Sequence, residues 1–427
     1  MNILQAMRER VLLYDGAKSA FVVSLSSASV DVPDIHNISN PSVVREVYRT
    51  YYQAGSDCLQ TLTYNSNRVK LHECGMEDKL REIIDRSIGL AREVVGDKCY
   101  VIGTAGPLGK LLRPIGDLTI ERTYELFAEQ LALFEEFGAD AIHLDGFKSM
   151  KELKVALMAA KENTKLPVIC GVSVEKNGKT LMGEDICSMA VTMKSLGADV
   201  ISLSDGDGAA SMVRTCAAAA QSGQMLCVRP NAGTPYIVGD RLVSPDSDDA
   251  ISQFCEEYIH SGARLIGGTF GTSPRTIEII RETLGNLSVP AWTTNDDRLH
   301  PWLTGGNSRV RIDRSFHPLS VHEVIGPEPV IDLDDMFDVI REIAGRKCDV
   351  LYLDVDKAMD EELPIEYVLG DMQTYIKRPI VFRSSNAGML EKAVRSYNGR
   401  PGIVTDSDIS AGIARKYGCL EFSNSLC

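Results

Sequence analysis

Short apolar runs alternate with longer segments of helical periodicity along the first two-thirds of the chain. Each run is apolar or β-branched for a few residues, which is typical of a strand that is buried on both faces. The runs are VLLYDG (11–16), DCLQTLT (57–63), YVIGTAG (100–106), AIHLDG (141–146), PVICGVSV (167–174), VISLSDG (200–206), MLCVRPN (225–231) and RLIGGTFG (264–271). Between them, helical patterns cover residues 76–95, 123–140 and 208–223, among others.

This alternation predicts parallel strands that are connected by crossover helices. Because an open doubly wound sheet usually has fewer strands, the eight runs predict that the sheet closes into a (β/α)8 TIM barrel. Phrases such as FGADAIHL and LGADVISL precede several runs, as expected where a glycine ends a helix and a short turn enters the next strand. We therefore predict one barrel domain over residues 1–290.

The remaining chain predicts a second, smaller α/β domain. Residues 291–315 are polar and rich in turn-forming residues, so we expect a linker. After it, the candidate strands are 320–324, 349–355, 379–385 and 401–406, and the candidate helices are 333–345 and 387–397. A segment of about 110 residues is too short for another eight-stranded barrel. We predict that residues 316–427 form a half-barrel or a small sandwich, which packs on the first domain or on another subunit.

Composition narrows the class of protein. With 44% hydrophobic and 24% charged residues, the chain is typical of a globular protein. A net charge of −14 argues against binding to nucleic acid and against docking on an anionic membrane. We expect neither a signal peptide nor a spanning helix, and therefore a cytoplasmic protein. The 11 cysteines form no CxxC pair, and we expect reduced, mostly buried thiols.

Polar residues follow the apolar runs at the points where catalytic groups of a barrel are found. The candidate catalytic residues are Asp145, Asp205 and His143, and the candidate substrate-binding residues are Asp15, Gly16, Thr63, Asn231 and Thr269. Clustered carboxylates repel one another, so we expect a cation among them: a substrate ammonium, a lysine such as Lys18, or a metal. Structural alternatives remain open, namely a turn role for Asp15, a core histidine at 143, and turn and N-cap roles for the 205–208 segment.

Six segments in one collinear order resemble the barrel of the homocysteine S-methyltransferase family, which betaine- and cobalamin-dependent methionine-forming enzymes share. They are LLYDGAKSAF (12–21), AGSDCLQTLTYNSN (54–67), GTAGPLG (103–109), NGKTLMG (177–183), VRPNAGTP (228–235) and LIGGTFGTSP (265–274). The resemblance covers about two-thirds of the chain and implies the TIM barrel. It also implies that Asp145, with Asp15, binds the amino group of an acceptor amino acid.

The family binds zinc through three thiolates, one after the sixth strand and two after the eighth, and the metal holds the acceptor sulfur as a thiolate. The resemblance places Asp205 at the first position and Thr269–Phe270 at the other two. We therefore expect no thiolate-bound zinc and no other metal. The alternative is an oxygen- and imidazole-based site that uses Asp205, Asp207 or His143.

The C-terminal segment is similar, more weakly, to the pterin-binding module of cobalamin-dependent methionine synthases. DVLYLDVD (349–356), PIVFRSS (379–385) and YNGRPGIV (397–404) carry the similarity. However, Asp356 and Arg383 replace the asparagine and the aspartate of that module, and only the turn at 398–401 is retained. We expect a packing or dimerisation role rather than folate binding.

Taken together, the resemblance implies a methyltransferase of one-carbon metabolism. Without thiolate zinc, we expect methyl transfer between a small polar or cationic methylated compound and a corrinoid held by a partner protein. Asp145, Asp205 or His143 would protonate the departing group. Two alternatives are kept: homocysteine methylation without the usual zinc site, and a non-catalytic barrel that binds a ligand or a corrinoid protein. A homo-oligomer is expected.

Overall fold

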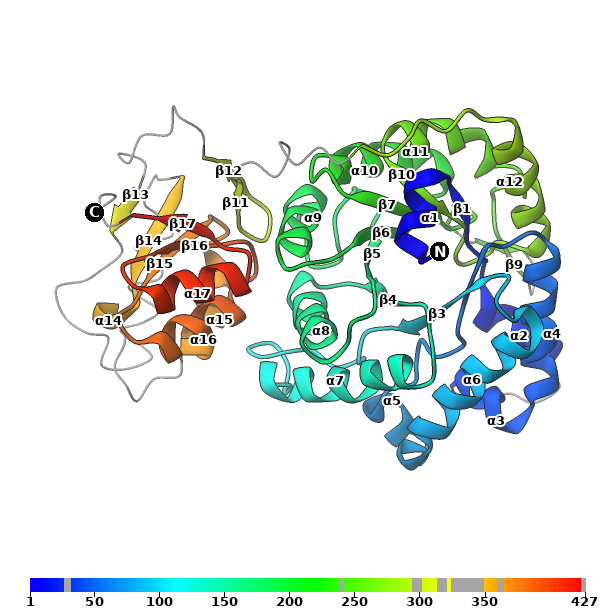
Figure 1. Ribbon diagram of the computed structural model, residues 1–427, viewed down its shortest axis with the longest axis horizontal. Coiled ribbons are helices and arrows are strands. Elements are labelled where there is room, and N and C mark those ends of the chain that lie inside the picture. Colours follow the sequence, from blue (N-terminus) through cyan, green and yellow to red (C-terminus); the bar gives the residue numbers. More distant parts are fainter. Residues whose placement is uncertain are drawn as a thin grey trace.

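The computed structural model describes residues 1–26, 32–234, 236–238, 241–293, 302–312, 321–323, 349–358 and 365–423. Within these ranges the chain forms a barrel and a smaller C-terminal unit beside it (Figure 1). None of the described helices is long and apolar enough to cross a membrane. The nine described cysteines are free thiols, and all except Cys74 are buried.

Eight parallel strands form the barrel, and each corresponds to one of the predicted apolar runs. They are β1 (Leu12–Leu13), β2 (Cys58–Gln60), β3 (Tyr100–Ala105), β4 (Ala141–Phe147), β5 (Val168–Val174), β6 (Val200–Asp205), β7 (Met225–Pro230) and β10 (Ala263–Ile266). Strand β1 pairs with β10, and a bridge between Tyr14 and Cys58 joins the other side of β1 to β2. The prediction of a TIM barrel is confirmed.

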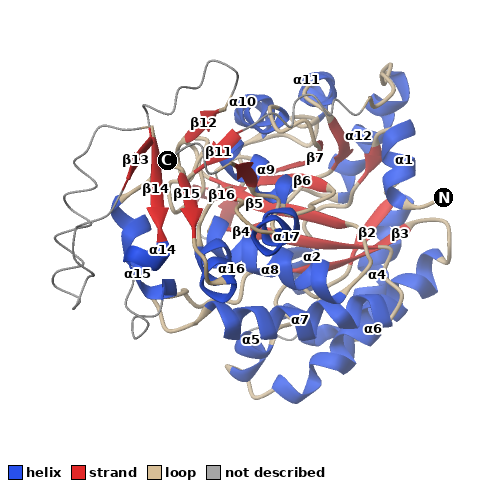
Figure 2. Ribbon diagram, turned by 60° about the vertical axis from the view of Figure 1, so that its left-hand side comes forward, coloured by secondary structure: helices blue, strands red, loops and turns tan. Residues whose placement is uncertain are grey.

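Helices surround this sheet (Figure 2). They are α1 (Ile3–Glu9), α2 (Lys18–Leu25), α3 (His36–Ser39), α4 (Pro41–Gln53), α5 (Arg68–His72), α6 (Leu80–Val95), α7 (Ile120–Glu136), α8 (Met150–Asn163), α9 (Ile186–Ser195), α10 (Ala209–Ala220), α11 (Cys255–His260) and α12 (Pro274–Asn286). Short 3-10 turns cover Pro33–Ile35, Glu77–Lys79 and Ser252–Phe254. Because α6 buries residues spaced three and four apart, such as Leu80, Ile83 and Ile84, one face of the helix packs on the strands.

Alternate strand residues belong to two different cores. Leu13, Leu59 and Ile142 face the helices, whereas the residues next to them, such as Leu12 and Ala141, face the barrel axis. Helix α1 adds Ile3, Ala6 and Met7 to the inner core at the amino ends of the strands. Apolar side chains therefore fill the amino end of the barrel. The polar residues of the barrel interior lie toward the carboxyl ends of the strands.

The C-terminal unit is built on a five-stranded parallel sheet. Its strands follow one another in sequence order: β13 (Val321–Glu323), β14 (Val350–Asp354), β15 (Ile380–Arg383), β16 (Gly402–Val404) and β17 (Leu420–Phe422). Its described helices are α14 (Val355–Ala358), α15 (Ile365–Tyr375), α16 (Ala387–Ser396) and α17 (Asp408–Lys416). An ordered parallel sheet of this kind corresponds to part of a barrel. The helix predicted at 333–345 lies outside the described residues.

Two antiparallel hairpins were not predicted from the sequence. One, β8 (Tyr236–Val238) with β9 (Arg241–Val243), is inserted between the last two barrel strands. The other, β11 (Trp302–Thr304) with β12 (Arg309–Arg311), lies inside the segment expected as a linker. Thr304 of this hairpin hydrogen-bonds Thr192 of the barrel helix α9 at 2.8 Å and exchanges two hydrogen bonds with Arg400 of the C-terminal unit. This hairpin therefore fastens the two units to each other.

The C-terminal unit packs against the α8 and α9 side of the barrel (Figure 1). Leu112, Val155 and Met158 of the barrel share one apolar cluster with the C-terminal unit. Lys154 of α8, which is 2% exposed, donates hydrogen bonds of 2.7 Å to the carbonyl oxygens of Val394 and Tyr397. The ammonium therefore satisfies backbone acceptors at the carboxyl end of α16.

We expect Lys154→Met to lower the free energy of unfolding by about 2 kcal/mol at pH 7, because the two carbonyl groups would lose their donor. The control Lys161→Met, on the same helix but exposed beside Asp199, should change it by less than about 0.5 kcal/mol. Burial lowers the pKa of Lys154 to about 8, so the folded chain binds fewer protons than the unfolded chain above that pH. The difference between the wild-type protein and Lys154→Met should therefore grow between pH 8 and 10 in urea titrations. Parallel curves would contradict this assignment.

Candidate functional site

A cavity of about 360 Å³ opens at the carboxyl ends of the barrel strands. Its walls come from the ends of several strands and from the loops that follow them. The lining residues that carry polar or aromatic groups are Lys18, Ser19, Gln60, Thr61, Tyr64, Thr104, Asp145, Ser204, Asp205, Arg229, Thr269 and Phe270. Ligands of TIM barrels bind at this end of the fold.

Lys18 and Asp15 form a buried ion pair at one side of the cavity. The Lys18 ammonium lies 2.5 Å from Asp15 Oδ2 and 3.2 Å from Gln60 Oε1. Asp15 also accepts a hydrogen bond from the backbone N–H of Gln60 at 2.8 Å. Burial lowers the pKa of Lys18 to about 8, although Asp15 opposes this shift. The cation that the sequence predicted among the carboxylates is therefore, at this position, a lysine.

Arg229 and Asp145 form a second buried ion pair, at 2.6 Å. Arg229 also donates to Gln60 Oε1 at 3.0 Å, and Gln60 donates to Asp145 at 3.2 Å, so Gln60 connects the two pairs. Burial alone would raise the pKa of Asp145, but the charge of Arg229, together with the hydrogen bonds from Arg229 and Gln60, holds this pKa well below its usual range. Asp145 is therefore an anion at neutral pH.

His143 lies beneath this network. Its Nδ1 is 3.1 Å from both Tyr14 Oη and Gln60 Nε2, and its ring stacks on Tyr14 with centroids 5.7 Å apart. Because these neighbours can donate to Nδ1, the ring proton belongs on Nε2, which faces Asp145 Oδ1 at 3.6 Å. Burial lowers the pKa of His143 to about 4. The histidine is therefore neutral, and it orients its neighbours from the barrel interior.

Asp205 stands apart from both ion pairs. It is the last residue of β6 and has a φ of 68°, a left-handed conformation that aspartate tolerates better than most residues. Its carboxylate accepts hydrogen bonds from Ser173 Oγ at 2.6 Å and from Thr269 Oγ1 at 3.1 Å. Within the described residues it forms no ion pair. Its charge therefore faces the cavity with only neutral partners.

The structure brings half of the predicted site residues into the cavity wall: Gly16, Asp145, Asp205 and Thr269. The other four occupy different places. Asp15 and His143 are fully buried behind the wall. Thr63 is also fully buried, and its hydroxyl donates to the carbonyl oxygen of Thr104 at 2.7 Å. Asn231 accepts hydrogen bonds from the N–H groups of Gly208 and Gly233, and so connects the loops after β6 and β7.

Three residues of the site were not selected from the sequence: Gln60, Arg229 and Tyr64. Gln60 and Arg229 lie within two of the buried strands and directly follow the core residues Leu59 and Val228. A polar residue in a buried strand needs a hydrogen-bond or ion-pair partner, so its presence in the strand could have indicated a polar site. Tyr64 lies in the segment after β2. In that segment the threonines and Asn67 match the family motif, and Tyr64 has no such match.

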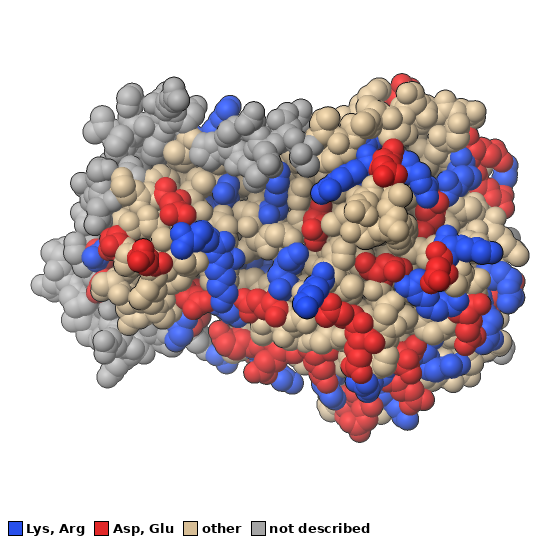
Figure 3. Space-filling view, viewed as in Figure 1, with Lys and Arg blue, Asp and Glu red and all other residues tan. Residues whose placement is uncertain are grey.

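Within the described residues, no group of three or more His, Cys, Asp or Glu side chains has an arrangement that would hold a metal ion. Two of the carboxylates, Asp15 and Asp145, are instead paired with Lys18 and Arg229. On the molecular face in Figure 3, acidic and basic side chains are interspersed rather than gathered into a continuous basic surface.

This fold and this cavity define the class: a TIM barrel whose binding cavity lies at the carboxyl ends of its strands. The chain belongs to the homocysteine S-methyltransferase family, whose family model matches residues 12–284.

Two relatives show how much of the family architecture is shared. A methionine synthase of Mycobacterium tuberculosis is 26% identical over 315 residues, which are 68% of this chain and 26% of the relative. Homocysteine S-methyltransferase 2 of Saccharomyces cerevisiae is 28% identical over 264 residues, 57% of this chain and 80% of the yeast protein. The chain therefore spans only about a quarter of the mycobacterial relative.

The fold is also that of a solved structure, the homocysteine methyltransferase MmuM from Escherichia coli in its metallated form. The TM-score is 0.57 at 18% identity, and the match covers 66% of this chain and 99% of that one. At this identity the likeness concerns the fold alone.

We expect Arg229→Gln to lower the free energy of unfolding by about 3 kcal/mol, because it leaves Asp145 charged and buried without its partner. The double variant Arg229→Gln, Asp145→Asn should lose less than the sum of the two single variants, since the unpaired charge is then absent. Arg45→Gln, in the more exposed pair with Glu93, is the control and should cost less than about 1 kcal/mol. Urea unfolding gives all four values, and strictly additive losses would argue against a coupled pair.

Proposed function

We propose that this protein transfers a methyl group from a small methylated cation to a corrinoid acceptor carried by a partner protein, without a thiolate-bound zinc ion. The observation that carries the proposal is Asp205, which stands in the cavity wall where the family resemblance places a zinc thiolate. It offers a negative charge without an ion-pair partner in the described residues.

The residues that we align with the three zinc positions, on the family resemblance, do not suit a thiolate site. Asp205 and Thr269 offer oxygen atoms, and Phe270 offers a phenyl ring, whereas this kind of zinc site needs sulfur. Cys227 of β7 lies in the inner apolar core, and burial raises the pKa of its thiol to about 12. A protonated, buried thiol is not a zinc ligand. The proposed transfer therefore has no step that uses zinc.

A quaternary ammonium or a sulfonium has no N–H group to donate, so a protein recognises it through charge and aromatic faces. Lys18 and Arg229 each have a carboxylate partner, which leaves Asp205 as the uncompensated charge of the described cavity wall. Phe270, whose side chain is 44% exposed, lines the same cavity and offers its ring. Both features favour a ligand with a single positive charge.

The chemical step follows from a cationic donor. The lone pair of the acceptor forms a bond to the methyl carbon while the bond from that carbon to the donor heteroatom breaks, and the heteroatom keeps the electron pair. The donor leaves as a neutral amine or sulfide, so no proton has to be supplied. The chain contributes by holding the methyl group in line with the acceptor and by excluding water.

This changes the roles expected for Asp145 and His143. Asp145 is ionised because of Arg229, and the neutral His143 lies behind the cavity wall, so neither is suited to donate a proton at pH 7. We propose instead that they hold Gln60 and Arg229 in place. Asp205 binds the cation.

A protein-borne acceptor also fits the rim of the barrel. Leu181 after β5, Ile237 in the hairpin after β7 and Phe270 after β10 are exposed apolar side chains on loops at the carboxyl ends of the strands. Apolar side chains exposed around a cavity favour contact with another protein. This supports the proposed partner.

A thiol acceptor such as homocysteine is the second candidate. Asp145 Oδ1 is buried in the cavity wall without a hydrogen-bond partner in the described residues, and an α-ammonium group would satisfy it. The nearby ammonium of Lys18 would favour the thiolate form of the acceptor. Methyl transfer to homocysteine by the zinc-free protein, with no transfer to cob(I)alamin, would favour this candidate over the first.

We expect Asp205→Asn to lower kcat/KM about 30-fold with cationic donors, which corresponds to roughly 2 kcal/mol of lost charge attraction. Asparagine tolerates the same left-handed backbone, so the fold should be retained. Methyl transfer from glycine betaine, tetramethylammonium and trimethylsulfonium to cob(I)alamin is measured by absorbance. Asp207→Asn is the matched control, because Asp207 lies outside the cavity wall and pairs with Lys176 at 3.1 Å. Equal losses in both variants would contradict the assigned role, and turnover with none of these donors would favour a non-catalytic barrel.

We expect the purified protein to contain far less than one zinc per chain, and the triple variant D205C, T269C, F270C to bind about one, because three thiolates then stand at the family positions. Mass spectrometry of the metal content measures both. The double variant T269C, F270C, which has one ligand fewer, serves as the control. Stoichiometric zinc in the wild-type protein would refute the zinc-free proposal.

A further inference from the structure

Lys18 begins helix α2, at a position that disfavours a positive charge. The amino end of a helix carries partial positive charge on its free N–H groups, so a lysine at the first residue is unfavourable. Helix α2 has no acidic residue in its first turn, and Ala17 before it offers no side-chain cap. Lys18 is nevertheless only 6% exposed. Local helix chemistry therefore does not account for this buried cation, whereas its contacts in the barrel cavity do.

The turn that carries Lys18 is closely packed. Gly16 and Ala17 lie between β1 and α2. A Cβ atom at Gly16 would lie 2.9 Å from Thr272 Oγ1 and 3.0 Å from Tyr51 Oη, so the backbone packs directly on both side chains. Tyr51 also donates a hydrogen bond to the carbonyl oxygen of Ala17 at 3.1 Å. These contacts fix the point from which the Lys18 side chain extends.

Two oxygen atoms receive the Lys18 ammonium: Asp15 Oδ2 at 2.5 Å and Gln60 Oε1 at 3.2 Å. Gln60 Oε1 also accepts from Arg229 at 3.0 Å, and Gln60 Nε2 donates to Asp145 at 3.2 Å, so the orientation of the amide is fixed. A carboxylate oxygen beside an amide oxygen suits any ammonium group that has N–H bonds. In this chain the protein itself supplies that ammonium group.

Lys18 also separates Asp15 from the cavity. Lys18 and Gln60 line the cavity, whereas Asp15 is 0% exposed and is not part of its wall. The ammonium group of a ligand would reach Asp15 only by displacing Lys18. Burial lowers the pKa of Lys18 to about 8, so at pH 7 the group is still charged and repels a second cation beside it. The carboxylate of Asp205 is the one left for a cationic ligand.

We propose that Lys18 is a specificity-determining residue, whose ammonium occupies the place beside Asp15 and Gln60 that the primary ammonium group of a ligand would otherwise take. The cavity therefore selects a fully alkylated cation, which needs no hydrogen-bond acceptor, over a primary ammonium compound of similar size. This selectivity rests on the proposed function, because the alkylated cation is the methyl donor proposed above. The occupation of the place by Lys18 can be tested without any methyl transfer.

The test removes the Lys18 side chain and supplies its missing part as a free amine. n-Propylammonium contains the same non-hydrogen atoms as the part of lysine beyond Cβ. At pH 8, where an alkylammonium is still charged, Lys18→Ala should bind it at least about tenfold more tightly than the wild-type protein does, and its melting temperature should rise. Tetramethylammonium has the same charge but no N–H group, so its affinity should increase much less. Isothermal titration calorimetry and thermal unfolding measure both effects.

Two further variants serve as controls. Lys18→Ala combined with Asp15→Asn removes the accepting carboxylate and should gain no affinity for n-propylammonium. Lys176→Ala removes an exposed lysine that pairs with Asp207 outside the cavity wall, and it should bind both cations as the wild-type protein does. Lys18→Ala leaves Asp15 buried without its partner and so loses stability. If this variant unfolds, n-propylammonium should restore its folding and tetramethylammonium should not.

The role of Lys18 is overturned if Lys18→Ala gains no affinity for n-propylammonium and is not refolded by it, if tetramethylammonium gains equally, or if the gain persists without Asp15. Tighter binding of n-propylammonium than of tetramethylammonium by the wild-type protein would overturn the selectivity. The proposed function fails separately: if the wild-type protein binds no tetramethylammonium and transfers no methyl group, a gain for n-propylammonium in Lys18→Ala would still establish what Lys18 occupies.

Discussion

The pairing of buried charges determines how the carboxyl end of this barrel is built. Asp15 and Asp145 are almost completely removed from solvent, and an unpaired carboxylate in such a place would cost several kcal/mol. Lys18 and Arg229 neutralise them, and Gln60 joins the two pairs through its amide. The positive and negative charges of these two pairs therefore balance, and Asp205 is the remaining charged residue of the described cavity wall.

The same pairing of charges explains why His143 and Asp145 are not suited to proton transfer, the role that their residue types suggest. A histidine and a carboxylate at a strand end are usual candidates for proton transfer. Here the neighbouring Arg229 keeps Asp145 ionised, and burial keeps His143 neutral, so their chemistry is fixed by their surroundings. Both contact Gln60, which lines the cavity, and this contact is consistent with the positioning role proposed above.

The fold was largely accessible from the sequence because buried parallel strands are apolar throughout, and each run was recognisable without its partners. The site was accessible only in part. Asp145 and Asp205 could be selected because they end strands, and the shared face of His143 and Asp145 follows from their spacing of two. How deep each side chain lies along the barrel axis depends on strand register, so the burial of His143 and Thr63 could not be read from the chain. The pairing of Arg229 with Asp145 also depends on strand register, so it could not be predicted from the sequence around Arg229.

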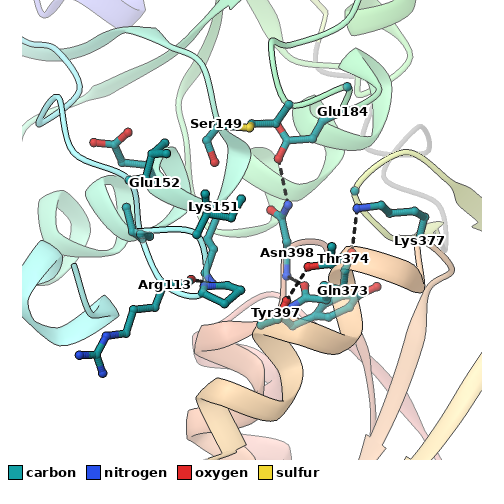
Figure 4. Close-up of a pocket in the computed structure, with 18 of the residues that line it drawn as sticks. Arg113, Ser149, Lys151, Glu152, Glu184, Gln373, Thr374, Lys377, Tyr397 and Asn398 are labelled. Carbon is teal, nitrogen blue, oxygen red and sulfur yellow. Dashed lines mark hydrogen bonds between the residues drawn. The ribbon is translucent and has the colours of Figure 1, made fainter. Parts of the chain in front are cut away.

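Hairpin β11–β12 shows the same limit at the level of domains. Its polar, turn-rich sequence is typical of a linker, and only its contacts with Thr192 and Arg400 make it a structural connection. These contacts, together with Lys154, hold α15 and α16 beside the loops after β4 and β5. Strand β4 ends two residues beyond Asp145, and Ser149 of the loop that follows and Lys151 of α8 line a second cavity, of about 200 Å³, between the barrel and the C-terminal unit (Figure 4). One short stretch of chain therefore contributes residues to the walls of both cavities.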